Sequence, residues 1–453
     1  MNTSRRRFLQ STAAGFAGLR AFAASARASN PAAGYGPIQT DPEKILNLPR
    51  GFSYRVVSRT GDQMTDGLIV PAAADGMAAF PGPGGKVILI RNHELSPDPK
   101  GKTGPFGAGH KLFSKIRAAK VYDIGPKNVP CVGGTTTLVF DTKSQRLESQ
   151  FLSLTGTVRN CAGGPTPWNS WISCEESVLT RGKECSKSHG FNFEVPATSQ
   201  PQLADPIPLT DMGRFNHEAI AVDPKSGIVY ETEDRPDSSI YRFIPTEPGK
   251  LAKGGNLQAL AIKGRKSLDT RNWTQQNVKQ GDVLQVEWVD LKHVATNSDQ
   301  LRYQGFFKFA ARFARGEGMW YGNDAIYFAC TSGGKAQRGQ IWKYTPSPNE
   351  GKPGETNKPG HLELFIEPND EALVDMADNL TVAPWGHLMI CEDGKNGNNL
   401  VGCSSKGEVY RFAENAYNDS EFAGATFSPD GSTLFVNIQK PGWTFAITGP
   451  WQG

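Results

Sequence analysis

The sequence of 453 residues predicts an all-β protein, a six-bladed β-propeller with long insertions between its strands. Three observations lead to this fold class. A pair of short apolar strands joined by a turn recurs six times along the chain. The strands alternate apolar and polar positions and are rich in β-branched and aromatic residues. Fifty glycines and 31 prolines, about 18% of the chain against roughly 12% in average proteins, supply the turns.

Each repeat has a first strand, a turn rich in Gly, Pro or Asp, and a second strand that ends in polar or acidic residues. The first strands are predicted at residues 75–80, 160–163, 217–222, 317–320, 378–382 and 424–427. The second strands are predicted at residues 86–94, 170–176, 228–234, 325–331, 387–393 and 433–439. Another strand follows some repeats, at residues 240–243, 341–344 and 409–412. No capped amphipathic helix of ordinary length competes with these strands.

The two ends of the repeat region are expected to meet. Residues 52–57 and 444–447 both have strand character, and pairing them in one blade would close the ring and remove its free edges. Four long insertions separate the strands, at residues 95–130, 180–210, 247–302 and 346–360. Loops of this length are usually functional or mobile. Because the repeats continue on both sides of each insertion, we expect one propeller domain over residues 51–453, preceded by an extended segment at 29–50.

The N-terminus has the parts of an export signal in their usual order. Arginines 5–7 precede Phe8 and Leu9, a weakly apolar run follows, and a small-residue cleavage site lies at residues 26–28. Paired arginines before Phe-Leu are typical of a twin-arginine signal, which we predict over residues 1–28. No later segment reaches the roughly 18 consecutive apolar residues of a membrane helix. We therefore expect a periplasmic or secreted protein, exported by the twin-arginine machinery, with no integral membrane segment.

The charge of the chain does not indicate a nucleic-acid partner. The formal net charge is +4, which by itself would favour a polyanion. However, five arginines and no acidic residue lie within residues 1–28, so the remainder has 44 basic residues against 45 acidic ones. The apparent basicity belongs to the predicted signal. We expect a nearly neutral protein that binds no nucleic acid and is a monomer.

Acidic residues recur at matched positions of the repeats. Those at the ends of the second strands are Glu94, Glu175, Glu176, Glu233, Asp234, Glu392 and Asp393, and those near the starts of the first strands are Asp75, Glu218, Glu317 and Asp378. Radial blades would gather them around a central channel, although a single acid at a strand end is most often a solvated turn residue. Crowded carboxylates repel one another unless they are protonated or share a cation. Oxygen ligands favour Ca²⁺ or Mg²⁺, and a thiolate among them favours a transition metal.

Cysteine and histidine residues accompany these acids. The seven cysteines all follow residue 28, and their odd number leaves at least one thiol unpaired. Most are expected to be buried structural residues. Cys174 is the exception, because two glutamates follow it directly. The tripeptide Asn-His-Glu occurs at both 92–94 and 216–218, and its histidines are expected either to pack in the core or to hold the neighbouring glutamates in position.

The motifs resemble those of the PhoX-type alkaline phosphatases and of their compact relatives, propeller proteins of undefined function. They are found at residues 160–164, 166–168, 173–176, 213–218, 230–234, 378–380 and 391–394. The resemblance covers nearly all of the chain after the predicted signal, and it implies a six-bladed propeller with a central cluster of Fe³⁺ and Ca²⁺. It implies that the metal ligands are Cys174, Glu175, Glu218, Glu317 and Asp393, with Glu94 and Asn92 nearby. One departure is residues 331–334, Thr-Ser-Gly-Gly, where an acidic strand end is expected.

The resemblance also implies a phosphomonoesterase that acts on a small phosphate ester. Arg235, directly after two acids, is the candidate for holding the phosphate oxygens, with a salt bridge to those acids as the alternative. Two other functions are left open. A calcium-dependent lactonase or esterase propeller would use His93 or His217 as its base. A non-catalytic propeller would use its metals only to stabilise the ring, while its long loops bind a partner.

Overall fold

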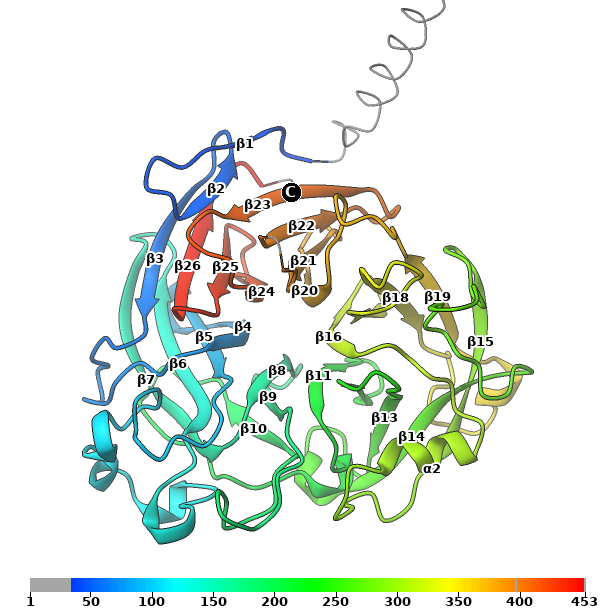
Figure 1. Ribbon diagram of the computed structural model, residues 1–453, viewed down its shortest axis with the longest axis horizontal. Helices are drawn as coiled ribbons and strands as arrows, with labels where there is room; N and C mark the ends of the chain where they lie inside the picture. The colour runs from blue at the N-terminus through cyan, green and yellow to red at the C-terminus, as the bar shows by residue number, and fades with distance from the viewer. Residues whose placement is uncertain (1–33, 396, 452–453) are drawn as a thin grey trace, which may run out of the picture.

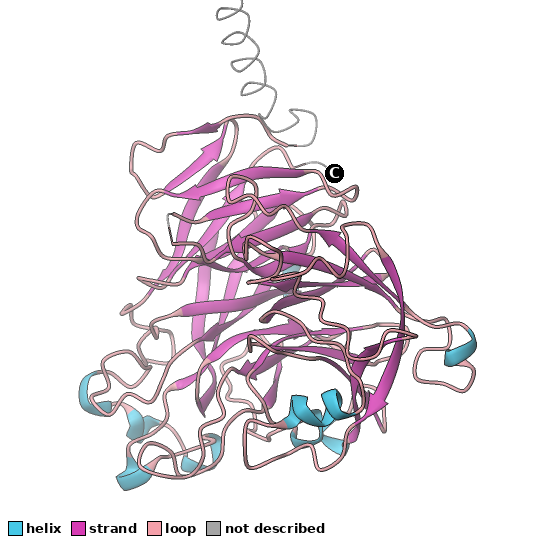
Figure 2. Ribbon diagram, turned by 45° about the vertical axis from the view of Figure 1, so that its right-hand side comes forward, coloured by secondary structure: helices cyan, strands magenta, loops and turns pink. Residues whose placement is uncertain are grey.

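The computed structural model describes residues 34–395 and 397–451, and its regular secondary structure consists mainly of β-strands arranged around a centre (Figure 1). The predicted signal lies outside the described residues. Strands form the body of the molecule, and most of the short helical turns lie at its periphery (Figure 2). Among the described residues, no helix is long and apolar enough to cross a membrane.

The described strands form five sheets. One four-stranded sheet contains β4 (Ala74–Pro81), β5 (Val87–His93), β6 (Gly133–Asp141) and β7 (Arg146–Thr157). A three-stranded sheet contains β8 (Asn160–Pro165), β9 (Ser170–Glu175) and β10 (Asn192–Pro196). A second four-stranded sheet contains β24 (Phe422–Phe427), β25 (Thr433–Ile438), β26 (Trp443–Thr448) and β3 (Ser53–Arg59).

The other two sheets are larger. The six-stranded sheet has the order β1 (Ile38–Gln39), β2 (Leu46–Pro49), β23 (Val409–Asn415), β22 (Asn399–Cys403), β21 (Leu388–Glu392) and β20 (Ala377–Val382). The nine-stranded sheet has the order β11 (His217–Val222), β12 (Val229–Glu233), β13 (Ile240–Pro245), β14 (Gly255–Ile262), β15 (Val283–Asp290), β19 (His361–Ile366), β18 (Gln340–Thr345), β17 (Ala325–Cys330) and β16 (Gly316–Gly322).

The helical elements of the described chain are short. They are the α-helix α2 (Leu301–Phe307) and the 3₁₀ turns η1 (Pro83–Gly85), η2 (Ala108–His110), η3 (Phe113–Lys115), η4 (Ala118–Lys120), η5 (Pro126–Asn128), η6 (Thr210–Met212), η7 (Leu251–Lys253) and η8 (Glu355–Asn357). Four of these turns, η2 to η5, lie between β5 and β6, inside the insertion predicted at 95–130.

The propeller-like all-β fold is confirmed, but six separate blades are not observed. The third and fourth repeats share the nine-stranded sheet, because β15 pairs with β14 on one side and with β19 on the other. Both β14 and β15 belong to the segment 247–302, which the sequence predicted as an irregular insertion. The segment 180–210 likewise contains β10. These insertions therefore widen the sheets as well as forming loops.

The first strands of the six repeats, β4, β8, β11, β16, β20 and β24, lie side by side in a closed ring around the centre (Figure 1). Each of them bulges at the same place. The register jumps lie at Ala74/Met77, Asn160/Gly163, His217/Ile220, Gly316/Met319, Ala377/Leu380 and Ala423/Thr426. A bulge leaves its residues unpaired and redirects their side chains. The six bulges therefore determine what faces the centre.

The second residue of the bulge is glycine or alanine in five of the six inner strands, and it is Asn379 in β20. A Cβ atom on Gly76 would lie 2.5 Å from the Cα atom of Ala162 in β8. A Cβ atom on Gly318 would lie 2.7 Å from the Cα atom of Asn379 in β20. Glycine at these two positions lets the inner strands pack backbone to backbone, which keeps the ring narrow.

The two ends of the described chain close the structure. Strand β26 pairs antiparallel with β3, with Phe445 opposite Val56 and Thr448 opposite Ser53, which confirms the predicted pairing. The segment expected to be extended at 29–50 contains β1 and β2, and β2 pairs with β23. Phe445 itself is fully buried in an apolar cluster that includes Phe412 and Leu434.

Replacing Phe445 by alanine is expected to lower the free energy of unfolding by about 3–5 kcal/mol, because it leaves a cavity where the ring closes. Urea unfolding followed by tryptophan fluorescence would measure the loss. Phe307→Ala is the matched control, since the Phe307 side chain is 86% exposed. Equal unfolding midpoints for the two variants would show that the closure contributes little.

Candidate metal centre

The bulges of the inner strands place one ligand-type side chain after another around the centre. The first residues of five bulges are Asp75, Cys161, Glu218, Glu317 and Asp378, and the sixth is Gly424. Among the described residues, three overlapping groups have ligand atoms within 4.8 Å of one another. They are Cys161 with Glu176 and Glu218, Glu218 with Glu317 and Asp378, and Asp378 with Asp393 and Glu421. The groups share members, so they form one continuous cluster.

Pairs of acidic residues at the ends of the second strands add further carboxylates to the centre. In two of the acidic pairs, the first residue is held by backbone N–H groups of residues that lie outside the strands. Glu175 accepts backbone N–H bonds from Val158 (2.9 Å) and Gly190 (2.8 Å), and Glu392 accepts one from Asp375 (2.8 Å). Successive side chains of a strand point to opposite sides. The second residue of each pair, Glu176 or Asp393, therefore reaches the central cluster.

Glu94, Asp75 and Asp234 surround these groups. Gln439, at the end of β25, donates to Asp75 Oδ2 (3.0 Å) and to Glu94 Oε2 (2.9 Å). Arg159 lies 2.7 Å from Glu94 and also pairs with Glu176. Arg315 lies 2.8 Å from Asp234 and 2.7 Å from Glu317. Two guanidinium groups thus contact the cluster and offset part of its negative charge.

The protonation of the cluster reflects its crowding. Burial, with repulsion from Glu176 and Asp378, raises the pKa of Glu218 well above its usual range. Burial, with repulsion from Asp378 and Asp234, does the same to the pKa of Glu317. Burial raises the pKa of Glu176 to about 7 even though Arg159 opposes the shift. Carboxylates in such a site are stabilised in their charged form by cations.

The donor set fits metal ions. Carboxylate oxygens are the preferred ligands of Ca²⁺. The single sulfur of the cluster, Cys161, is fully buried, and burial together with Glu218 and Glu176 raises the pKa of its thiol. A metal that accepts sulfur would be needed to hold it as a thiolate beside these carboxylates. The geometry therefore suits hard cations among the acids and one transition-metal ion at Cys161.

Three of the residues predicted as ligands, Glu218, Glu317 and Asp393, lie in the cluster. Glu94 lies beside it through Arg159 and Gln439. The Asn92 side chain makes other hydrogen bonds. Its amide donates to the carbonyl oxygens of Cys161 (3.2 Å) and Ala162 (2.6 Å), so it holds the bulge that presents Cys161.

The structure does not bring Cys174, Glu175 or Arg235 into the cluster. Cys174 packs in an apolar cluster with Ile172 and Phe215. Glu175 is bound by backbone N–H groups, as described above. Arg235 Nε lies 2.7 Å from Asp299 Oδ2, in the loop before α2, rather than against a carboxylate of the channel.

Sequence reasoning missed Cys161 and Glu421 as cluster members, and it placed Glu176 at the channel without naming it as a ligand. A signal for Cys161 was present, because it follows Asn160 at the start of β8 just as Glu218 follows His217 at the start of β11. Aligning the repeats by their first strands would have selected it. Glu421 precedes β24, and no repeated pattern marks it.

The two histidines of the Asn-His-Glu tripeptides do not face the cluster. His93 Nδ1 lies 2.9 Å from the Ala72 carbonyl, and its Nε2 lies 2.9 Å from Thr136 Oγ1. The His217 ring stacks on Phe215 at 3.5 Å, and its Nδ1 lies 3.2 Å from Glu231. Both rings are buried among partners of their own, so neither is placed to act as a base at the centre.

The fold and the centre together define a propeller-like protein with a buried acidic cluster suited to cations. The sequence model of the family described as "Alkaline phosphatase PhoX" matches residues 33–442. The chain belongs to this family, which confirms the resemblance predicted from its motifs. A comparison with curated proteins gives no significant match.

Solved structures share the fold. PhoX of Pseudomonas fluorescens, in complex with vanadate as a transition-state analogue, superposes with a TM-score of 0.65 at 18% identity, over 92% of this chain and 98% of that chain. A gluconolactonase of Xanthomonas campestris has a TM-score of 0.39 at 12% identity, over 92% of this chain and 98% of that chain. The second likeness is too weak to support any inference about function.

Proposed function

We propose that the protein is a metal-dependent phosphomonoesterase and that the acidic cluster at the centre of the ring is its active site. Membership of the PhoX family supports a phosphatase. The observation that carries the proposal is the continuous cluster running from Cys161 through Glu218 and Asp378 to Glu421. A buried set of carboxylates that includes one thiol suits a cluster of metal ions better than a single one.

We assign Fe³⁺ to the group that contains Cys161, with Glu176 and Glu218. The two all-carboxylate groups suit Ca²⁺. Bound there, such ions would neutralise a phosphate ester, polarise its P–O bonds and make a bound water acidic enough to attack. The residues themselves supply the fixed positions, because each ligand stands on a bulge or strand end of the ring.

Arg159 and Arg315 are the groups best placed to hold phosphate oxygens. Each already contacts two carboxylates of the centre, and both side chains retain some exposure. A guanidinium binds two oxygens of a phosphate side by side, which fixes its orientation. In our proposal these two residues take the part that the sequence suggested for Arg235.

The remaining predictions belong to the same proposal. A small phosphate ester is the substrate class, and the protein acts as a periplasmic or secreted monomer exported by the twin-arginine route. The ring of six bulged inner strands supports a six-bladed arrangement in which β15 joins two blades at their outer edges.

Chelation is expected to abolish the hydrolysis of p-nitrophenyl phosphate, because the carboxylates cannot position a phosphate without cations. Activity should return on addition of Ca²⁺ when the iron has been retained. The assay compares untreated, chelated and reloaded protein, with a γ-lactone as a second substrate.

Phosphatase activity that is unchanged after chelation would contradict the proposal, provided elemental analysis confirms that the metals are gone. Hydrolysis of the lactone alone would favour the lactonase alternative. Turnover of neither substrate by metal-loaded protein would favour a binding propeller.

A further inference from the structure

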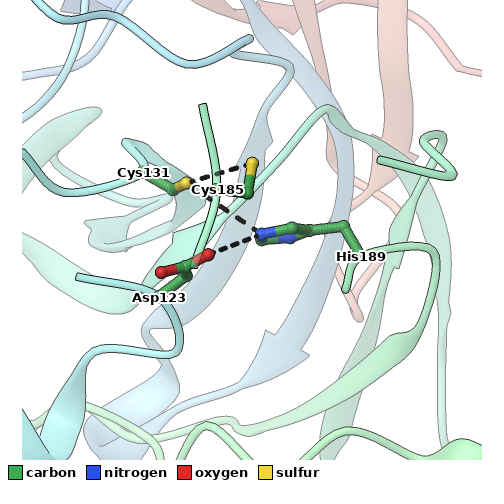
Figure 3. Close-up of side chains that lie close together, drawn as sticks. All are labelled: Asp123, Cys131, Cys185 and His189. Atoms are coloured by element: carbon green, nitrogen blue, oxygen red, sulfur yellow. Dashed lines mark hydrogen bonds and ion pairs between the residues drawn. The ribbon is translucent and has the colours of Figure 1, made fainter. Parts of the chain in front are cut away.

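A second cluster of ligand-type side chains lies away from the centre, between two long connections of the chain (Figure 3). Asp123 and Cys131 belong to the connection between β5 and β6, and Cys185 and His189 to the connection between β9 and β10. The Asp123 and His189 side chains are 0% exposed, and Cys131 and Cys185 are 1% exposed. Each residue offers one ligand atom within 4.8 Å of the others. Four ligand-type groups are thus buried together within reach of one ion.

We propose that these four residues bind Zn²⁺ in a closed tetrahedral site that joins the two connections. Two cysteines, one histidine and one carboxylate are a ligand set of the kind that zinc takes in proteins. The site is separate from the acidic cluster, and the zinc site would stand whether or not the centre hydrolyses phosphate esters. Its role is structural, because four protein ligands leave no position for a substrate.

The distances agree with tetrahedral coordination. With a Zn–S bond of about 2.3 Å, two cysteine sulfurs on one zinc lie roughly 3.8 Å apart. The Sγ atoms of Cys131 and Cys185 lie 3.8 Å apart. With Zn–N and Zn–O bonds of about 2.0 Å, a nitrogen and an oxygen ligand lie roughly 3.3 Å apart. His189 Nε2 and Asp123 Oδ2 lie 3.2 Å apart. Cys131 Sγ lies 4.0 Å from the same nitrogen, somewhat longer than the ideal spacing.

The histidine is oriented for this role. Its Nδ1 lies 2.6 Å from Glu175 Oε1, and backbone N–H groups of Val158 and Gly190 hold that carboxylate in place. A carboxylate that accepts the Nδ1 proton leaves Nε2 with a lone pair for a metal, which is the usual arrangement around zinc-bound histidine. Nε2 points to Asp123 and the two cysteines (Figure 3).

Backbone hydrogen bonds also hold the Asp123 side chain in position. Asp123 Oδ2 accepts backbone N–H bonds from Ser186 (2.7 Å) and Lys187 (2.9 Å), and Oδ1 accepts one from Gly125 (2.7 Å). These bonds tie the two connections together around the carboxylate. These three bonds leave one of the about four acceptor positions of a carboxylate, on Oδ1.

A disulfide between Cys131 and Cys185 is the competing explanation. It would require the sulfurs to approach from 3.8 Å to about 2.05 Å. Glu175 is the residue before Glu176 of the acidic cluster, so zinc binding would also steady the end of β9 at the centre.

The test compares metal content in three proteins produced with their own N-terminal segment. Wild type is expected to contain one zinc per chain that the double variant C131S/C185S lacks. The double variant C330S/C403S is the matched control, because Cys330 and Cys403 are equally buried but lie in apolar clusters. Cobalt added in place of zinc should give the charge-transfer absorption of thiolate-bound Co²⁺ in wild type and in the control, and lose it in C131S/C185S.

A second measurement covers the case in which C131S/C185S does not fold. Wild type is treated with a thiol-alkylating reagent with and without a chelator, in the absence of reductant, and the peptides are identified by mass spectrometry. We expect Cys131 and Cys185 to be protected until the chelator is added and alkylated afterwards. A peptide pair joined by a Cys131–Cys185 disulfide would overturn the proposal, as would wild type without zinc or zinc retained in folded C131S/C185S.

Discussion

Replacing Cys161 by serine is expected to abolish phosphatase activity, whereas the same change at Cys174 leaves most of it intact. Cys161 is the only sulfur among the described residues of the acidic cluster, and its bulge places it with Glu176 and Glu218. Serine keeps the shape but supplies no thiolate, so the transition metal loses its softest ligand. The loss of activity should exceed the roughly 10- to 100-fold that follows when only an outer partner of a ligand is removed.

Steady-state hydrolysis of p-nitrophenyl phosphate and iron content should be measured on the same samples. C174S is the matched control, because both cysteines are buried and lie in the same sheet. Iron and activity lost together in C161S, and retained in C174S, support our assignment. Iron and activity lost in C174S but retained in C161S would identify Cys174, which the family motifs suggested, as the sulfur ligand.

The metal-free protein is expected to lose stability as the pH rises from about 5 to 8. Burial, with repulsion from neighbouring carboxylates, raises the pKa of Glu218, Glu317 and Asp378 in the folded state. The folded protein therefore binds more protons than the unfolded chain above the ordinary carboxyl pKa near 4, so the free energy of unfolding falls as pH rises. The slope is about 1.4 kcal/mol per pH unit for each carboxyl protonated only in the folded state. The pKa of Glu176, about 7, places part of this loss near neutrality.

Thermal unfolding of chelated protein at several pH values, with and without Ca²⁺, tests this expectation. Calcium should remove most of the pH dependence, because it favours the charged carboxylates. Asp378→Asn should stabilise the chelated protein at pH 8 and weaken the stabilisation by calcium. Asp62→Asn, at an exposed position, is the control. A chelated wild type that becomes more stable between pH 5 and 8 would show that the carboxylates are not held together without metal.

Much of the fold could be predicted because the first and second strands of the repeats are short and strongly patterned. Several strands that escaped prediction, β10, β14 and β15, lie inside the predicted insertions. In β15, the partly or fully buried Leu284, Val286 and Trp288 alternate with the exposed Gln285 and Glu287, a strand pattern that was overlooked inside the predicted insertion. Its place between β14 and β19 depends on a pairing between segments far apart in the chain. No local pattern can specify that, so the joined sheet was not foreseen.

The site was predicted in part, since Glu218, Glu317 and Asp393 lie in the cluster and Cys174 and Glu175 do not. The acids of the repeats were found, but Cys174 was selected because two glutamates follow it, and the set of ligands was taken from the family resemblance. Four of the seven cluster residues, Cys161, Glu218, Glu317 and Asp378, come from bulges in the first strands, where the two-residue period breaks. A bulge cannot be recognised from the alternation of apolar and polar residues along a strand. The repeat position that holds Cys161, Glu218 and Glu317 can be recognised by comparing the repeats with one another.

The pairing of β26 with β3 has a consequence for biosynthesis. Strand β3 is among the first parts of the described chain to leave the ribosome, and β24, β25 and β26 are among the last. The ring of inner strands cannot be completed before β24 has been synthesised. Until that moment the acids of the earlier repeats have no enclosed centre, and cations can reach them freely. Metal capture and completion of the fold are therefore expected to coincide, after translation has nearly ended.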